Sequence, residues 1–150
     1  MLTRKDVSPM TDSTPLSDFR PVRSALMTGA LDDLASVGLA GSRCRACGET
    51  TLGANTLCPN CGSDDVFPIA LSGEGKVWTY TVVRYRPPGD YKGAEPFQPF
   101  AIGLVELPEG LRVVAPVGGD PDAVRIGMTV RFTARARADG VVDFVYNPAA

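Results

Sequence analysis

Two Cys-x-x-Cys motifs stand ten residues apart in this sequence, at Cys44 and Cys47 and then at Cys58 and Cys61. A glycine follows each motif and allows a tight turn of the backbone there. Residues 42–68 are rich in turn-forming residues and contain no apolar period long enough to build a core. Such a segment folds only if something other than burial holds it together, and four thiolates at this spacing are typical of a bound metal ion.

The predicted metal is zinc. A complete shell of four cysteines leaves no position for water or substrate, so the ion is expected to be structural rather than catalytic. We therefore expect one Zn²⁺ per chain, bound by Cys44, Cys47, Cys58 and Cys61. Two disulfides, a redox-active CxxC or iron in the same cage are the alternatives, although a reducing compartment favours metal over disulfides.

The overall charge argues against general binding to nucleic acid. The chain of 150 residues has 15 basic and 17 acidic residues, a formal charge of -2, so no net positive field attracts phosphates. The N-terminal residues lack the apolar segment of a secretory signal, and no run approaches the roughly 18 apolar residues of a membrane span. We expect a cytoplasmic protein that binds neither nucleic acid nor membrane.

The chain divides by composition into four segments. Residues 1–20 are rich in Ser, Thr, Asp and Pro and are predicted to form a flexible tail. Residues 21–40 are predicted to be helical, because Met27, Leu31 and Leu34 recur at helical spacing. The cysteine segment, residues 41–68, and a C-terminal domain, residues 69–150, follow.

Alternating apolar and polar residues after Pro68 predict five β-strands. In the first, Val77, Thr79, Thr81 and Val83 are expected on one face, and Lys76, Trp78, Tyr80 and Val82 on the other. The remaining four form two predicted hairpins, joined by turns at Pro108–Gly110 and at Asp139 and Gly140. These strands cover residues 101–107, 111–117, 129–137 and 141–146.

A long loop, residues 84–99, separates the first two predicted strands and contains four prolines with Tyr85, Tyr91 and Phe97. Loops of this length inside compact domains are usually functional or disordered. The aromatic content favours a docking surface, and Phe100 follows directly.

A second candidate surface is basic. Arg131, Arg135 and Arg137 fall on one face of a predicted strand. They are expected either to be solvated or to contact phosphates of a nucleotide-like cofactor or an acidic partner.

The sequence offers no catalytic residue. It contains no histidine, all four cysteines are assigned to the metal, and no Walker or Rossmann glycine loop occurs. We expect no enzymatic activity from the chain alone.

Several sequence blocks resemble a known family. After the cysteine motifs come SGEGKVWTYTVVRYRP, then PFAIGLVELPEGLRVVAPV, then IGMTVRF. In this order they are similar to the zinc-ribbon/OB-fold proteins first catalogued as domain of unknown function 35. The resemblance implies a mostly β chain with a rubredoxin-like ribbon and a five-stranded OB barrel. The sequence departs from the family between the cysteine pairs, where it has Gly53-Ala-Asn-Thr56.

The resemblance also implies a function. Members of the family are accessory subunits of thiolase-like acyl-CoA enzymes, such as the small subunit of benzoylsuccinyl-CoA thiolase. The chain is therefore expected in a hetero-oligomer with a thiolase-fold protein, where it would support assembly and the acyl-CoA pocket. Tyr85, Tyr91, Phe97 and Phe100 are the expected partner contacts. A steroid side-chain acyl-CoA aldolase as partner and single-stranded nucleic-acid binding by the OB fold are the alternatives.

Overall fold

The computed structural model describes residues 19–149, so the predicted tail, residues 1–20, lies almost wholly outside the described part of the chain. Strands dominate residues 19–149. Their helical structure is limited to two short 3-10 turns, η2 (Leu34–Ser36) and η3 (Pro121–Ala123). None of the helical segments in this range is long and apolar enough to cross a membrane.

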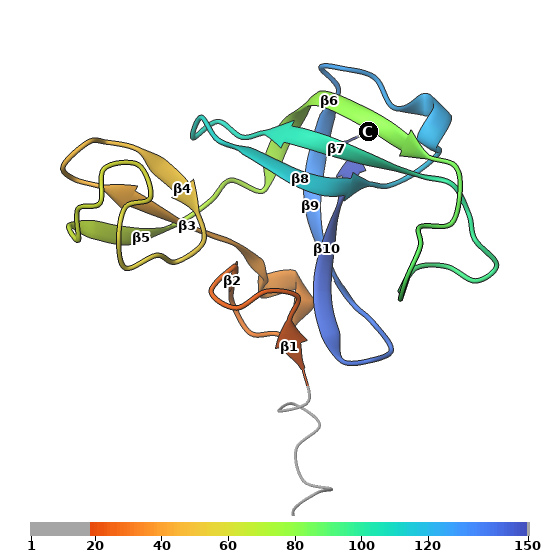
Figure 1. Ribbon diagram of the computed structural model, residues 1–150, viewed down its shortest axis with the longest axis horizontal. Coiled ribbons are helices and arrows are strands. Elements are labelled where there is room, and N and C mark those ends of the chain that lie inside the picture. Colours follow the sequence, from red (N-terminus) through yellow and green to blue (C-terminus); the bar gives the residue numbers. More distant parts are fainter. Residues whose placement is uncertain (1–18, 150) are drawn as a thin grey trace, which may run out of the picture.

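Five strands in the C-terminal half close into a barrel (Figure 1). Neighbours follow the order β10-β8-β7-β6-β9, and the antiparallel pairing of β9 with β10 completes the circle. This is the five-stranded OB arrangement, so the predicted barrel is confirmed. Its strands are β6 (Glu74–Val83), β7 (Phe100–Glu106), β8 (Arg112–Val117), β9 (Thr129–Ala136) and β10 (Val141–Pro148).

A β-bulge in β6 changes which side chains enter the barrel. Val77 pairs with Val105 and Thr79 with Leu104, so Trp78 is the extra residue and the alternation shifts there. Beyond the bulge Tyr80 and Val82 pack against the core, and Thr79 and Thr81 are exposed. The predicted facing of the first strand is correct up to Val77 and wrong after it.

The cysteine segment forms a second, smaller sheet. The central strand β3 (Gly38–Cys44) pairs antiparallel with β4 (Thr50–Leu52) and β5 (Val66–Ala70), and β2 (Met27–Thr28) extends it near its start. Because β3 ends at Cys44, this sheet positions the first cysteine.

The predicted N-terminal helix is wrong. Residues 21–40 instead contain the end of β1 (Arg20–Pro21), then β2, η2 and the start of β3. Backbone angles exclude a helix here, because Ala25 has φ 61° and Gly29 has φ 87°. The apolar residues behind the prediction still share a surface, since Met27, Leu31 and Leu34 pack beside the buried side chains of Val37, Ala134 and Val142.

The ribbon and the barrel share one core. Leu39 of β3 and Leu71, in the linker after β5, belong to the same buried cluster as Val77 and Val105 of the barrel. The linker is also held by polar bonds, because the backbone N–H and hydroxyl of Ser72 donate to Glu109 Oε2 at 2.9 and 2.8 Å. The junction is therefore packed rather than a free hinge.

Candidate functional site

The two cysteine motifs fold into turns with the same hydrogen bonds. In the first, the Gly48 N–H donates to the Cys44 carbonyl at 2.9 Å and the Cys44 N–H to the Glu49 carbonyl at 3.0 Å. In the second, the Gly62 N–H donates to the Cys58 carbonyl and the Cys58 N–H to the Ser63 carbonyl, both at 2.8 Å. Both glycines have φ 80°, which explains why glycine follows each motif.

The structure brings the four predicted cysteines together. Their sulfur atoms all lie within 4.8 Å of one another, with Cys44 to Cys61 at 3.6 Å and Cys47 to Cys58 at 3.7 Å. Disulfide sulfurs lie about 2.05 Å apart, so these distances are too long for disulfides. They match the edge of about 3.8 Å of a tetrahedron of sulfurs about 2.3 Å from zinc.

Without a cation, the thiols of Cys47 and Cys61 have pKa shifts of opposite sign. The pKa of Cys47 is lowered to about 6, first by a hydrogen bond from the Asn60 side chain and then by a backbone bond involving Glu49. For Cys61 the backbone of Ser63 acts to lower the pKa, but the sulfur of Cys44, burial and the other two thiols together raise it to about 12. A divalent cation bound by all four sulfurs removes this conflict, so the donor set suits Zn²⁺.

Neighbouring side chains hold the cage in place. The Asn60 backbone N–H lies 3.4 Å from Cys58 Sγ, and its side-chain amide lies 3.5 Å from Cys47 Sγ. Arg45 pairs with Asp65 at 3.1 Å and stacks over Phe67 at 4.3 Å, which ties the first turn to β5.

The segment that departs from the family pattern has a structural role. Buried Ser42 donates its hydroxyl to the Gly53 carbonyl at 2.7 Å and accepts from the Asn55 N–H at 2.8 Å. Residues 53–55 thus supply both hydrogen-bond partners of the buried Ser42 hydroxyl in β3.

Three of the four aromatic residues predicted for partner binding form one cluster. The ring centroids of Tyr91, Phe97 and Phe100 lie 5.8 to 6.2 Å apart, with Tyr91 stacked on Phe100. Each is partly exposed. Tyr85 lies outside the cluster with 86% of its surface exposed, so it is the most exposed of the four.

Each of the three arginines of the basic stripe forms an ion pair with a carboxylate. Arg131 pairs with Glu74 at 3.1 Å, Arg135 with Asp143 at 2.9 Å, and Arg137 with Asp139 at 2.7 Å. The side chain of Arg137 holds the pKa of Asp139 down to about 2. Contact with a phosphate stays a prediction, and a phosphate would compete with these partners.

Two of the sequence predictions meet at one pocket. A cavity of about 410 Å³ lies between the loop and strands β8 to β10. Tyr91 and Phe100 line it from the aromatic cluster, and Arg135 and Arg137 from the basic stripe. Nothing in the sequence indicated that these two features are neighbours.

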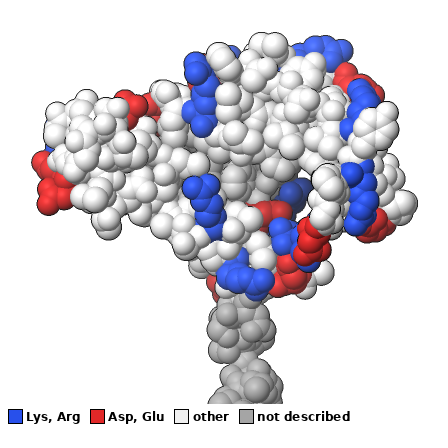
Figure 2. Space-filling model, viewed as in Figure 1, with Lys and Arg blue, Asp and Glu red and all other residues white. Residues whose placement is uncertain are grey.

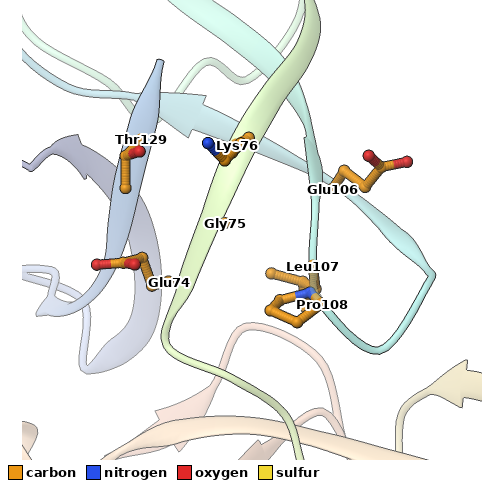
Figure 3. A pocket seen from close by; sticks show the side chains of 7 residues that line it. All are labelled: Glu74, Gly75, Lys76, Glu106, Leu107, Pro108 and Thr129. Carbon is orange, nitrogen blue, oxygen red and sulfur yellow. The ribbon is translucent and has the colours of Figure 1, made fainter. Parts of the chain in front are cut away.

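Sequence reasoning missed a second pocket and the residues beside it. Leu107 and Pro108 lie on one side of Gly75, and Glu74 and Thr129 lie on the other (Figure 3), around a pocket of about 260 Å³. Gly75 is needed here, because a Cβ would lie 2.7 Å from the Glu106 carbonyl oxygen. The lining carries charges of both signs, which come from Glu74, Lys76 and Glu106.

Comparison with known proteins identifies the architecture. Residues 34–66 match the model of the ChsH2 rubredoxin-like zinc ribbon domain, and residues 69–135 match that of the ChsH2 C-terminal OB-fold domain. The chain is 38% identical over 114 residues to a DUF35 domain-containing scaffold protein of Methanocaldococcus jannaschii, covering 72% of this chain and 78% of that protein.

This chain belongs to the DUF35 family of zinc-ribbon and OB-fold proteins.

Two further relatives have names that describe enzymes or their subunits. The benzoylsuccinyl-CoA thiolase subunit BbsA of Thauera aromatica is 29% identical over 107 residues, which is 69% of each chain. A solved structure named Ltp2-ChsH2(DUF35) aldolase is 32% identical with a TM-score of 0.61, covering 75% of this chain and 86% of that one. The family resemblance inferred from the sequence blocks is confirmed.

Proposed function

We propose that this DUF35 protein is a zinc-stabilised accessory subunit of a thiolase-fold acyl-CoA enzyme, where it supports assembly and the acyl-CoA pocket. The larger subunit would supply the catalytic residues. The zinc ion, bound by Cys44, Cys47, Cys58 and Cys61, would fix the ribbon as a rigid arm beside the barrel.

The observation that carries this proposal is that the chain shares parts of both its ribbon and its barrel with proteins named as a scaffold protein, a thiolase subunit and an aldolase. Each of the three relatives matches about 70% or more of this chain, so the shared part includes parts of both sheets. A sequence without histidine, whose cysteines converge on one cage, fits a supporting role.

A partner of the aldolase type is the second candidate. The solved neighbour carries aldolase in its name and matches at 32% identity, slightly above the 29% of the thiolase subunit. The two candidates share the accessory role and differ in the reaction of the larger subunit, so the identity of the partner separates them.

Co-purification tests the role. The tagged full chain is expressed in its own source cell, and the captured proteins are identified by mass spectrometry. We expect one thiolase-fold protein in near-stoichiometric amount, with CoA-thioester cleavage only when both chains are present. Capture of no thiolase-fold protein would contradict the proposal.

The exposed aromatic loop gives a sharper version of this experiment. We expect alanine at Tyr85, Tyr91, Phe97 and Phe100 together to abolish co-purification with zinc content unchanged, because aromatic residues dominate interface anchors. Ile126→Ala is the control, since Ile126 is 68% exposed and lies outside the loop. Unchanged co-purification of the fourfold variant would remove the loop from the interface.

A further inference from the structure

Each cysteine motif presents one buried and one exposed thiol. Cys44 and Cys58, the first cysteine of each motif, are buried, whereas Cys47 and Cys61, the second, are exposed. The turns beside the exposed pair are open, because a Cβ on the glycine after each motif would meet no atom of residues 19–149 within 4 Å. The ribbon projects from the barrel as the lobe on the left of Figure 2. Small solutes therefore reach two of the four sulfurs directly.

Each exposed sulfur has a buried sulfur of the other motif beside it. Cys47 Sγ lies 3.7 Å from Cys58 Sγ, and Cys61 Sγ lies 3.6 Å from Cys44 Sγ. Disulfide sulfurs lie about 2.05 Å apart, so each pair needs to close by less than about 2 Å. The cage thus contains two accessible thiols, each with a partner thiol in the other motif.

This arrangement suits oxidation by a peroxide. Cysteines that bind a metal ion are thiolates, and the thiolate is the nucleophilic form. Cysteines that sense oxidants are thiolates that solvent reaches and that lie next to a second, resolving cysteine. Cys47 beside Cys58 and Cys61 beside Cys44 meet both conditions.

We propose that the cysteine cage is a peroxide-sensitive switch, in which the exposed cysteine of each motif is oxidised and the buried cysteine of the other motif closes a disulfide. The thiolate of Cys47 or Cys61 first attacks hydrogen peroxide. The O–O bond breaks, the sulfur becomes a sulfenic acid, and the leaving hydroxide takes a proton to form water. The thiolate of Cys58 or Cys44 then attacks the oxidised sulfur and displaces a second hydroxide, which also takes a proton. Each disulfide thus consumes two thiolates, one peroxide and two protons, and yields two waters.

Oxidation is expected to open the ribbon and leave the barrel folded. A four-coordinate structural site is lost once its thiolates become disulfides, so the metal ion is released. Cys58 is the one buried residue among residues 45–68, so this segment has no core to hold it afterwards. The base of the ribbon stays anchored, because Leu39 and Leu71 belong to the buried cluster of the barrel. The switch goes beyond the proposed function, and its test needs no partner.

Peroxide titration of the full, zinc-loaded chain tests the switch. A chromophoric indicator follows released zinc, and mass spectrometry after alkylation locates the thiols and disulfides. Met27 and Met128 are the internal reference, since both are partly exposed and methionine is itself oxidised to the sulfoxide. The fluorescence of Trp78, the one tryptophan of the sequence, reports on the barrel, where Arg112 stacks over its ring.

We expect stoichiometric loss of zinc, with disulfides Cys47–Cys58 and Cys44–Cys61, before either methionine is oxidised. Trp78 fluorescence should stay constant, and dithiothreitol with added Zn²⁺ should restore the bound metal. Four results would overturn the inference: zinc retained until the methionines are oxidised, disulfides within each motif, a fluorescence change that shows an unfolded barrel, or a loss that reductant and Zn²⁺ do not reverse. The proposed function would stand in each case, because it requires only the reduced cage.

Cys58→His separates the resolving role from metal binding. Three cysteines and one histidine also bind zinc, but position 58 then has no thiol. With zinc bound, we expect sulfenic acid at Cys47, trapped with dimedone, to rise at least about fivefold over wild type. Cys61→His is the matched control, since it keeps the Cys47 and Cys58 pair and should trap no more at Cys47 than wild type. Equal trapping in both variants would contradict the pairing, and if neither variant binds zinc, the disulfide map of the wild-type chain decides.

Discussion

Gly29 and Ser36 approach so closely that a Cβ at Gly29 would lie 2.2 Å from the carbonyl oxygen of Ser36. Gly29 also has φ 87°, and the neighbouring Ala30 N–H donates to Ser36 Oγ at 3.0 Å. We expect Gly29→Ala to lower the free energy of unfolding by at least about 1–3 kcal/mol, because both the backbone angle and the contact reject a side chain.

The same substitution separates this structure from the predicted helix. In a helix, Gly29→Ala would raise stability by about 1 kcal/mol. Urea unfolding of the zinc-loaded chain measures the sign, with Gly73→Ala as control because a Cβ at Gly73 meets no atom within 4 Å. If Gly29→Ala proves more stable than wild type, the result would support the predicted helix and contradict this structure.

Asn60 is predicted to strengthen the metal site without being a ligand. Its side-chain amide lies 3.5 Å from Cys47 Sγ and is the main cause of the low pKa of that thiol. Losses of 10- to 100-fold in metal affinity are typical when such outer partners are removed, so we expect Asn60→Ala to lower zinc affinity by about tenfold. Competition with a chromophoric chelator measures it, and Asn147→Ala, which loses only a bond to Thr133 on the barrel, should bind zinc like wild type.

Tyr146 is predicted to make the barrel sensitive to alkali. Its side chain is fully buried, and its hydroxyl and Glu109 Oε1 have no hydrogen-bond partner among the described residues. Burial, and then the charge of Glu109, raises the pKa of Tyr146 to about 12. The unfolded chain loses this proton near pH 10, whereas the folded chain keeps it until about pH 12. Burial of the neutral Tyr146 ring therefore contributes fully to stability below pH 10, and this contribution is lost as pH rises toward 12.

Tyr146→Phe removes that dependence. At pH 8 we expect a change in the free energy of unfolding of less than about 1 kcal/mol, because the hydroxyl makes no bond to lose. Between pH 10 and 12 the wild type should lose up to about 2–3 kcal/mol relative to the variant. Urea unfolding at pH 8, 10 and 11 tests this, and parallel losses in both proteins would contradict it.

The sequence was sufficient for the barrel strands and the cysteine cage because both follow local rules. Alternation predicts a strand when one face is buried, and the two CxxC turns are complete within six residues each. The wrong prediction of a helix over residues 21–40 also came from a local rule, the spacing of apolar residues. Met27, Leu31 and Leu34 are apolar at helical spacing because they meet a surface of β9 and β10, and that contact depends on residues more than 90 positions away.

The other missed features are also non-local. The bulge at Trp78 is set by pairing with Val105 and Leu104, and the stacking of Arg112 on Trp78 depends on the order of β6, β7 and β8. A basic stripe read along one strand did not reveal that Asp143 on β10 lies opposite Arg135. Register and strand order decide these relationships, and neither follows from a single strand.

The metal site is the basis of the whole account, and X-ray absorption at the zinc edge tests it most directly. Protein purified under reducing conditions should contain one zinc per chain with four sulfur neighbours at about 2.3 Å. Addition of a strong chelator should then unfold the ribbon. A natively folded protein with no stoichiometric metal, or zinc bound through nitrogen and oxygen, would contradict the assignment of Cys44, Cys47, Cys58 and Cys61.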